Sequence, residues 1–548
     1  MNINKEFECD VLIVGGGIAG LIAAERSLKT FKKVCIIDSS KICSGASYFP
    51  LKATLGIQVT KNKNDYDKYY EDISNMGKNV ENPELIKTYI KNIKNNIHLL
   101  KRIGFKPWLR KDERPACFAK HSRNIYLIND WNGARKRANK IFRKNKRLKI
   151  FERSTLLRII KRDDKVVGAV FQNDDKFFFI KSKVIILASG GVAGNYKHSL
   201  YPKNINGACH TIALDAGAVL QNMEFIQFIP AYLKPKYNVL FGEHTLKYCT
   251  GIYDINDKLI FDGINNDENK RLFEERSSYA PFSYDFESSI IDLKISSIEK
   301  NIGVKLKYSE DLYKNEEEFY RVYLNWLKND IGIDLLKDEA VITHFAHSCN
   351  GGIKIDINGF TGIKGLYAAG ECSSAIEGAN RLGGNSVGGA LVFADNAVKH
   401  ALKYTKENKF YDNDIKIKDI EKEFNDWINE ISKDDNKNNM NKNEVLKNIR
   451  ELASENLSVI RSREKIENFF KEIEDIRSNY SIKENIERGS IEIYLIIENM
   501  KMTALSILER EESRGAHYRE DFQYSSDKIY KLQISRENNK TIINRQYI

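Results

Sequence analysis

The stretch DVLIVGGGIAG at residues 10–20 constrains the fold of this chain more than any other feature. It places Gly15, Gly17 and Gly20 in a G-x-G-x-x-G pattern between an apolar strand and a segment with helical spacing. In that setting the first glycine permits a tight turn, the second lets the backbone approach a pyrophosphate, and the third lets the helix pack closely against the strand. The pattern therefore predicts a Rossmann-like dinucleotide site.

The helix that follows this turn begins at Ile18 and Ala19, and we expect its free N–H groups and positive dipole end to face the phosphates. Asp38 ends the next apolar strand, KVCIID. A carboxylate at that position accepts hydrogen bonds from an adenosine ribose and disfavours a 2′-phosphate. The motif by itself leaves NAD and FAD as alternatives.

Two later segments favour FAD over NAD. Residues 148–188 alternate apolar segments with charged turns, which indicates a β-meander, and residues 352–395 return to the order strand, glycine-rich turn, helix. An extended cofactor held by both parts of a split domain is typical of FAD proteins with this layout. We therefore expect an FAD-binding domain formed by residues 1–229 and 340–405, with an insertion at 230–339.

The remainder of the chain, residues 406–548, has a helical and highly charged pattern. The polar, low-complexity stretch KDDNKNNMNKN at 433–443 interrupts it and is interpreted as a loop between helices. The predicted fold class is thus α/β, with a split Rossmann-like FAD-binding domain, an inserted domain and a C-terminal helical domain.

Cysteine usage and hydropathy exclude several protein classes. None of the 8 cysteines forms a C-x-x-C, C-x-x-C-H or zinc-ligand spacing. We therefore expect no iron–sulfur cluster, attached haem or metal site in this chain. No apolar run reaches the ~18–20 residues of a membrane helix, and the N-terminus shows no cleavable leader. A cytoplasmic protein without an integral membrane segment is the expectation.

The net charge is +12, and residues 101–149 carry a large share of it. No nucleic-acid recognition motif accompanies this basic run, so we do not expect nucleic-acid binding. A solvated, lysine-rich face is the favoured interpretation. A docking face for an acidic electron-transfer partner is the alternative.

The chain resembles the flavoprotein subunit of the succinate dehydrogenase and fumarate reductase family, which includes L-aspartate oxidase. The resemblance implies that the insertion at 230–339 is an α+β capping domain, and that hydride passes between flavin N5 and a carbon of a small carboxylate. The matching stretches run from end to end: VLIVGGGIAGLIAA (11–24), VIILASGGVAG (184–194), GAVLQNMEFIQF (217–228), HSCNGGI (347–353), GLYAAGECSSAIEGANRLGGNS (365–386) and ESRGAHYREDF (512–522).

The resemblance also implies roles for particular residues. Glu371 corresponds to the glutamate that holds the flavin ribityl chain, and the backbone N–H groups of Ser386 and Val387 point at the flavin pyrimidine edge. A helix that starts there stabilises the anionic reduced flavin. His347 and Arg381 correspond to substrate-binding residues, and an arginine fork pairs with a carboxylate through two hydrogen bonds. The resemblance further assigns to the cofactor site Ser39, Ser44, Gly45, Ala46, Ser47, Ala188, Ser189, Gly190 and Arg381.

For two of these residues a structural role is the alternative. His347 would then be a satisfied core histidine, and Arg381 would form a structural salt bridge.

Two departures from the family pattern concern the cofactor. Residues 44–57, SGASYFPLKATLGI, contain no histidine, whereas succinate dehydrogenases carry there a histidine that binds FAD covalently. Ala208 stands where the family has a flavin-contacting aspartate. We therefore expect non-covalent FAD. Since a covalent link generally raises the flavin potential, we also expect inefficient succinate oxidation.

Further departures concern the half of the substrate pocket that binds the far carboxylate and delivers the proton. Ile229 replaces the family's second substrate histidine, and Tyr284 stands where the family has a proton-donating arginine. Glu243, Tyr284 and Arg276 remain candidates for handling protons, and for Glu243 and Tyr284 an ordinary structural role is the alternative.

The leading hypothesis is an FAD-dependent oxidoreductase that acts on a small anionic substrate. Fumarate reductase or L-aspartate oxidase activity proper is the first alternative. The second is an electron-transfer subunit that works with a separate iron–sulfur protein, docked on residues 512–522 or on the basic face at 101–149. A flavin-binding protein without chemistry is the third.

Overall fold

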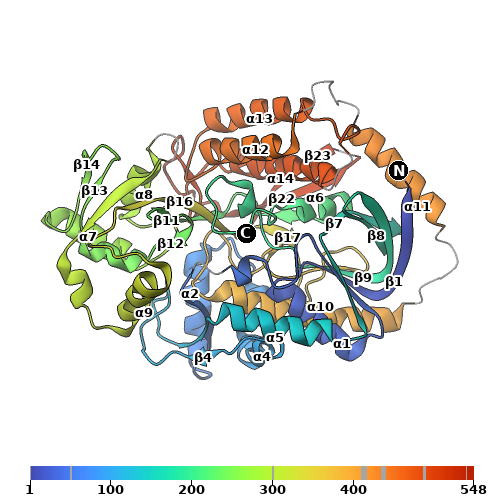
Figure 1. Cartoon of the computed structure of the whole chain (residues 1–548), viewed down its shortest axis with the longest axis horizontal. Helices are drawn as coiled ribbons and strands as arrows, with labels where there is room; N and C mark the ends of the chain where they lie inside the picture. The colour runs from blue at the N-terminus through green and yellow to red at the C-terminus, as the bar shows by residue number, and fades with distance from the viewer. Residues whose placement is uncertain are drawn as a thin grey trace.

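The computed structural model describes residues 2–49, 52–298, 302–408, 416–432, 440–485, 489–538 and 540–548. Most of the loop predicted at 433–443 lies outside these residues. Three parts are distinguishable in Figure 1: an α/β body, a lobe of strands and short helices at its left, and a layer of C-terminal helices above it.

The body is built on a seven-stranded sheet with the order β6-β2-β1-β9-β8-β7, in which β18 also pairs with β9. Val11, Leu12 and Ile13 of the central strand β1 are fully buried, as expected for a strand covered on both faces. Strands β7, β8 and β9 pair antiparallel in sequence order and confirm the predicted meander, whereas β6 pairs in parallel with β2 and lies outside it. The bounds are β1 (Ile3–Val14), β2 (Val34–Asp38), β6 (Leu148–Glu152), β7 (Ser154–Arg162), β8 (Lys165–Asn173), β9 (Lys176–Leu187) and β18 (Leu366–Ala368).

The two glycine-rich segments meet because their strands run parallel in one sheet. β1 pairs in parallel with β2 and β9, and β18 pairs in parallel with β9. The turns that follow β1, β9 and β18 therefore share the carboxyl edge of the sheet, where open α/β sheets bind their ligands. Helices α1 (Ile18–Thr30) and α10 (Asn385–Glu407) leave this edge and pack against each other.

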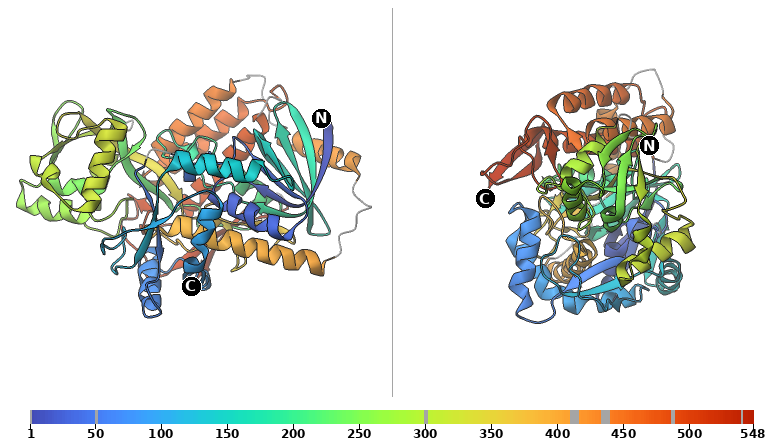
Figure 2. Two further views of the ribbon diagram at one scale, coloured as in Figure 1. Left: turned by 60° about the horizontal axis from the view of Figure 1, so that its bottom comes forward. Right: turned by 90° about the vertical axis from the view of Figure 1, so that its left-hand side faces the viewer.

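The inserted lobe has its own sheet, with the order β12-β11-β16-β15-β13-β14, and its own hydrophobic core. Figure 2 shows it projecting from the body. The expected boundary at 229/230 falls inside β11, and the one at 339/340 falls just before β16. The bounds are β11 (Ile226–Lys234), β12 (Val239–Leu240), β13 (Cys249–Tyr253), β14 (Leu259–Asp262), β15 (Val304–Tyr308), β16 (Ala340–Cys349), α7 (Asp267–Arg276), α8 (Ser289–Ser296) and α9 (Glu318–Trp326).

The C-terminal region contains the helices that the charged pattern predicts and ends in a β-hairpin that it does not. β22 pairs with β10 of the body, so the hairpin ties the end of the chain to the FAD-binding part. Leu532 and Ile534 are buried and alternate with polar residues, which is the period of a strand. The bounds are α11 (Ile417–Ile431), α12 (Lys442–Asn456), α13 (Arg463–Ser478), α14 (Ser490–Glu509), β22 (Tyr530–Glu537), β23 (Lys540–Tyr547) and β10 (Leu220–Gln221).

Further helices and short strands complete the body and the C-terminal region. In the described part of the chain, no helix has the length and apolar character needed to cross a membrane. The remaining bounds are α2 (Asp65–Gly77), α3 (Pro83–Asn96), α4 (His98–Arg102), α5 (Trp131–Arg143), α6 (Ala208–Asp215), β3 (Leu55–Val59), β4 (Trp108–Leu109), β5 (Asn124–Ile128), β17 (Gly352–Lys354), β19 (Ser373–Ser374), β20 (Ile460–Arg461) and β21 (Tyr518–Arg519).

Candidate functional site

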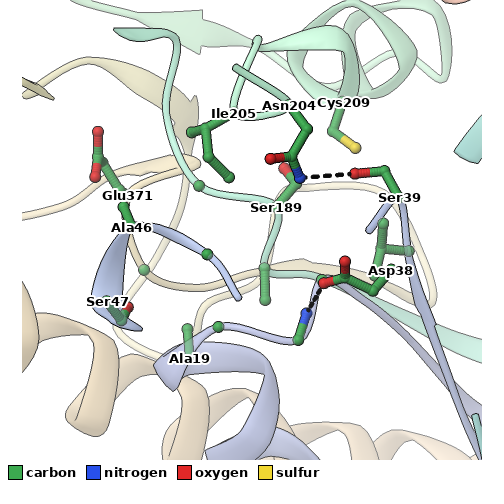
Figure 3. A pocket seen from close by; sticks show the side chains of 18 of the residues that line it. Ala19, Asp38, Ser39, Ala46, Ser47, Ser189, Asn204, Ile205, Cys209 and Glu371 are labelled. Carbon is green, nitrogen blue, oxygen red and sulfur yellow. Dashed lines mark hydrogen bonds between the residues drawn. The ribbon is translucent and has the colours of Figure 1, made fainter. Parts of the chain in front are cut away.

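The first glycine turn leads from β1 into α1 and forms one wall of a cavity (Figure 3). Gly15 has φ +106°, and a Cβ there would overlap the carbonyl group of Ala188; a Cβ at Gly20 would overlap the carbonyl oxygen of Gly15. A Cβ at Gly17, by contrast, would meet only Ser47 Oγ, at 3.8 Å. Gly15 and Gly20 are thus required by the protein backbone, whereas Gly17 keeps space open in front of the helix.

The start of α1 is suited to an anion. Gly17 caps the helix without a side-chain hydrogen bond, and the first turn contains no acidic residue. The N–H groups of the first turn lack the helical partners that later residues have. With the open space at Gly17, they form a cradle of the kind that binds a pyrophosphate.

Asp38 lies beside this cradle, at the end of β2. Its carboxylate accepts hydrogen bonds from the backbone N–H groups of Gly16 and Ser40, both at 2.7 Å. Burial raises the pKa of Asp38 to about 6, although these two hydrogen bonds oppose the rise. Next to it, Asn204 Nδ2 donates to Ser39 Oγ at 3.1 Å (Figure 3).

The cavity extends from Asp38 to the turns after β9 and β18. Among the residues predicted for the cofactor, Gly20, Ser44 and Arg381 do not line it. Those that do are Gly15, Gly17, Ile18, Ala19, Asp38, Ser39, Gly45, Ala46, Ser47, Ala188, Ser189, Gly190, Glu371, Ser386 and Val387.

Glu371 lies at the opposite end of the cavity from Asp38 (Figure 3). Its carboxylate accepts hydrogen bonds from the hydroxyl group of Tyr201 at 2.8 Å and from the N–H group of Cys349 at 3.0 Å. Burial raises its pKa to about 7. Ser386 and Val387 form the first turn of α10, which carries no acidic residue, so a second helix start opens onto the same cavity.

Arg381 directly precedes the glycine turn at 383–384 and reaches β11 of the inserted lobe. Its Nε donates to Gln227 Oε1 at 3.2 Å, and Gln227 is held in turn by Asn380 at 2.6 Å. None of the ion pairs formed by the described residues includes Arg381. The salt bridge that was the structural alternative for this residue is therefore absent from the described part, and the two terminal nitrogens remain for a ligand.

His347 is close enough to Arg381 and to Lys52 for both positive charges to act on it. Burial and these two charges hold its pKa well below the usual value, so the imidazole is neutral at pH 7. Its Nδ1 is buried and has no hydrogen-bond partner among the described residues. The alternative of a satisfied core histidine does not fit this environment.

Lys52 is a residue that sequence reasoning did not single out. Its Nζ donates to the carbonyl oxygen of Ala46, which lines the cavity, at 2.9 Å. Burial lowers its pKa to about 8, while Glu371 opposes the shift. The sequence could have indicated this residue only through its position, since Lys52 lies in the stretch 44–57 in which succinate dehydrogenases carry the FAD-linking histidine.

The three candidate proton donors of the inserted lobe have different surroundings. Arg276 is fully buried; its Nε and Nη2 bind Asp292 at 2.7 and 2.9 Å, and Nη2 also donates to the carbonyl oxygen of Ala280. The hydroxyl group of Tyr284 donates to the carbonyl oxygen of Gln523 at 2.8 Å. Glu243 is partly exposed, and burial raises its pKa while the charge of Arg276 opposes the rise.

Comparison with known protein families also identifies an FAD-binding domain in this chain. The FAD binding domain family matches residues 10–245 and 312–387, more than half of the chain, and the fumarate reductase flavoprotein C-terminal family matches residues 446–545. The chain belongs to the fumarate reductase and succinate dehydrogenase flavoprotein family. It is an FAD-dependent oxidoreductase of that family.

Individual relatives of the flavoprotein match over most of their length. An uncharacterized FAD-dependent oxidoreductase of Methanocaldococcus jannaschii is 29% identical, over 94% of this chain and 93% of that protein. An L-aspartate oxidase of Clostridium perfringens is 28% identical, over 75% of this chain and 91% of that protein. An E. coli quinol fumarate reductase structure has a TM-score of 0.78 at 20% identity, covers 99% of this chain and 97% of its own, and shows a shared fold.

The residues of the flavoprotein fit FAD. The helix start behind Gly17 offers N–H groups to a pyrophosphate, Asp38 offers a carboxylate to a ribose, and the start of α10 faces the far end of the cavity. Sequence reasoning missed the loop before α6 and the start of β7, because neither carries a recognisable motif. The lining residues it did not predict include Ser154, Thr155, Leu156, Asn204, Ile205, Asn206, Gly207, Cys209 and Glu492.

The pKa of Asp38 predicts how FAD binding depends on pH. A ribose hydroxyl donates to the ionised carboxylate better than to the protonated acid, so affinity should fall as the pH drops through about 6. We expect Asp38→Asn to bind FAD more weakly and without this step. Titration of apoprotein with FAD at pH 5 to 8, followed by flavin fluorescence, measures both. Equal affinity at pH 5 and 7.5 in the wild type would contradict the role of Asp38.

The segment ESRGAHYREDF is not a docking surface over most of its length, contrary to expectation. Glu512, Arg514, His517 and Arg519 are buried. Glu512 accepts hydrogen bonds from Arg514 and from Arg510 at 2.7–3.0 Å, and Arg519 binds Asp521. The charged residues of this motif form an internal network that holds the C-terminal region together.

Proposed function

We propose that the flavoprotein transfers hydride between non-covalently bound FAD and a carbon of a small molecule that carries at least one carboxylate. The proposal rests on the environment of the guanidinium group of Arg381. This group is oriented through Nε by Gln227 and enters no ion pair with the described residues. FAD supplies the hydride acceptor or donor; the residues of the chain bind and orient the substrate.

The surroundings of Arg381 favour an anion. The charges of Lys52 and Arg381 both act on His347. Lys52 lies beside the cofactor cavity, and Arg381 directly precedes the glycine turn at 383–384. A carboxylate can accept two hydrogen bonds from the fork of Arg381, and neutral His347 can add a third. Glu371 and Glu377 act electrostatically on Arg381, and Glu371 acts on Lys52, so these carboxylates offset part of the positive charge that a bound anion would meet.

Glu243 is the proton-handling group that we propose for the side facing the inserted lobe. The charges of Glu243, Arg381 and Arg276 all act on the thiol of Cys117, which lies at the seam between the lobe and the body. Arg276 is engaged by Asp292 and by backbone carbonyl groups, so we assign it to positioning the loop at 279–283. Tyr284 fastens the same loop to the C-terminal region.

The absence of a histidine from 44–57 predicts that FAD is not covalently linked. Precipitation of the holoprotein with acid should release all the flavin into the supernatant, because only non-covalent contacts hold it. Absorbance of the two fractions near the flavin band measures the distribution. Flavin that stays in the washed precipitate would contradict the prediction.

Binding of the proposed substrate class can be tested without knowing the reaction. Small mono- and dicarboxylates, among them fumarate, succinate and L-aspartate, are added to the oxidised holoprotein under anaerobic conditions, and the flavin spectrum is recorded. The matched controls are the corresponding amides, which keep the size but lose the charge. We expect saturable spectral changes with acids only. Equal responses to acids and amides, or none to either, would refute the proposal.

A second candidate function is electron transfer with a separate acidic iron–sulfur protein. The outer face of α5 exposes Lys136, Lys140 and Arg143, while Arg135 on its inner side donates to the carbonyl groups of Cys43 and Tyr48 at 3.0 and 3.1 Å. The basic face is thus one loop away from the cofactor cavity. Co-purification of an iron–sulfur protein that is lost in Lys136→Glu/Lys140→Glu would support this function, and retention in the double variant would exclude this face.

A further inference from the structure

The cofactor cavity is lined by three carboxylates, and one of them comes from an unexpected part of the chain. Asp38 and Glu371 belong to the FAD-binding part, at its two ends. The third, Glu492, lies in the first turn of α14 in the C-terminal region. The cavity is therefore completed by an element more than 100 residues away from the rest of its wall in sequence.

Glu492 is fixed in place through the loop before α6. Asn206 Nδ2 donates to Glu492 Oε1 at 2.9 Å, and Asn206 Oδ1 accepts a hydrogen bond from the N–H group of Ala208 at 3.2 Å. Asn206 thus links the carboxylate of Glu492 to the start of α6. Ala208 also lines the cavity and offers it only a methyl group.

Helix α14 cannot easily move away from this position. Thr211 of α6 donates through its hydroxyl group to the carbonyl oxygen of Leu495 at 2.9 Å. Gly207 has φ +72°, and a Cβ there would overlap the side-chain oxygen of Asn499, so α6 begins directly against a side chain of α14. The place of Glu492 in the wall of the cavity therefore follows from the packing of two helices and does not depend on a flexible side chain alone.

Glu492 lies in the first turn of α14, whose N-cap residue Gly489 makes no side-chain capping hydrogen bond. A carboxylate in the first turn of a helix interacts favourably with the positive end of the helix dipole. An ionised carboxylate repels a pyrophosphate and attracts hydrogen-bond donors. Among the groups of FAD, the sugar and ribityl hydroxyls are the donors that a lining carboxylate would bind, as Asp38 does at its own end of the cavity.

We propose that Glu492 is a cofactor-binding residue whose carboxylate accepts a hydrogen bond from a hydroxyl group of bound FAD. It supplies from the C-terminal region the acidic group that position 208 lacks. Bound FAD then bridges α6 and α14. Loss of FAD weakens the attachment of the C-terminal region to the body.

The test is the FAD affinity of apoprotein variants, measured by flavin fluorescence. Glu492→Gln keeps the shape and removes the charge, and it should raise the Kd for FAD about 10- to 100-fold, the loss typical of a hydrogen bond to a charged group. The double variant Ala208→Asp/Glu492→Gln should recover affinity, because it returns a carboxylate to the neighbouring position. Glu498→Gln is the matched control, since Glu498 lies on the same helix and pairs with Lys501 and Arg536.

Thermal unfolding separates cofactor binding from helix packing. The Tm of the Glu492→Gln apoprotein should stay near that of the wild type, while the increase in Tm caused by FAD should shrink. Should the variant fail to fold, Glu492→Asp keeps the charge, withdraws it by one carbon, and should still weaken FAD binding. The proposal is overturned if Glu492→Gln binds FAD as the wild type does, or if Glu498→Gln weakens binding equally. It is also overturned if the apoprotein Tm falls and Ala208→Asp restores nothing.

Discussion

Arg381→Gln is expected to lower kcat/KM for the carboxylate substrate by about 100-fold or more. Two charge-assisted hydrogen bonds from the guanidinium fork would be lost, each worth roughly 1.5–3 kcal/mol, and 1.4 kcal/mol corresponds to a tenfold change. The measurement is the rate at which the acid changes the redox state of the flavin, as a function of acid concentration.

Two controls make this prediction specific to substrate binding. Arg381→Lys keeps the charge and loses the planar fork, so its rate should fall between those of the wild type and the glutamine variant. The ratio of flavin to protein should stay unchanged in both variants, because Arg381 does not line the cofactor cavity. A normal rate in Arg381→Gln would exclude the residue as a substrate anchor, and a loss of flavin would move it to the cofactor site.

Gly17→Val is expected to yield a folded protein without bound FAD. The backbone at Gly17, with φ −77° and ψ −169°, is extended and accepts a β-branched residue. A Cβ there has only Ser47 Oγ nearby, so the side chain would fill the space in front of α1 that we assign to the pyrophosphate. The flavin-to-protein ratio after purification should be close to zero, with an apoprotein Tm near the wild-type value.

Gly20→Ala is the informative contrast to Gly17→Val. Its Cβ would overlap the carbonyl oxygen of Gly15, so the backbone of the turn itself must move. We expect a clear loss of Tm in the apoprotein as well as loss of FAD. Full FAD content in Gly17→Val, or equal effects of both variants on the apoprotein Tm, would contradict the assignment of separate roles to the two glycines.

The FAD-binding body could be predicted from the sequence because residues close together in the chain determine its main elements. The glycine spacing between β1 and α1, the apolar runs of β1 and β9, and the acidic residue at the end of β2 each specify their structure within a few residues. Gly388 lies inside α10, where a Cβ would overlap the hydroxyl group of Tyr89. Such positions can be recognised in the sequence because glycine inside a helix lowers its stability, so its presence indicates a close contact.

What could not be predicted depends on contacts between distant segments. Glu492 reaches the cofactor cavity only because α14 packs on α6, and Lys52 reaches its position only because the loop before β3 folds toward Glu371. The burial of Arg510 and Arg519 likewise turns an apparent surface motif into an internal network. No period or short spacing in the sequence encodes these contacts.

The most direct test of hydride exchange with a carboxylate is anaerobic stopped-flow mixing of the holoprotein with small carboxylates, in both redox states of the flavin. We expect at least one acid to reduce oxidised flavin, or to oxidise reduced flavin, with a rate that saturates. Where the acid reduces the flavin, that rate should fall when the reacting carbon of the acid carries deuterium, and in either direction the rate should collapse in Arg381→Gln. If no acid changes the redox state of the flavin in either direction, the claim that this flavoprotein exchanges hydride with a carboxylate is wrong.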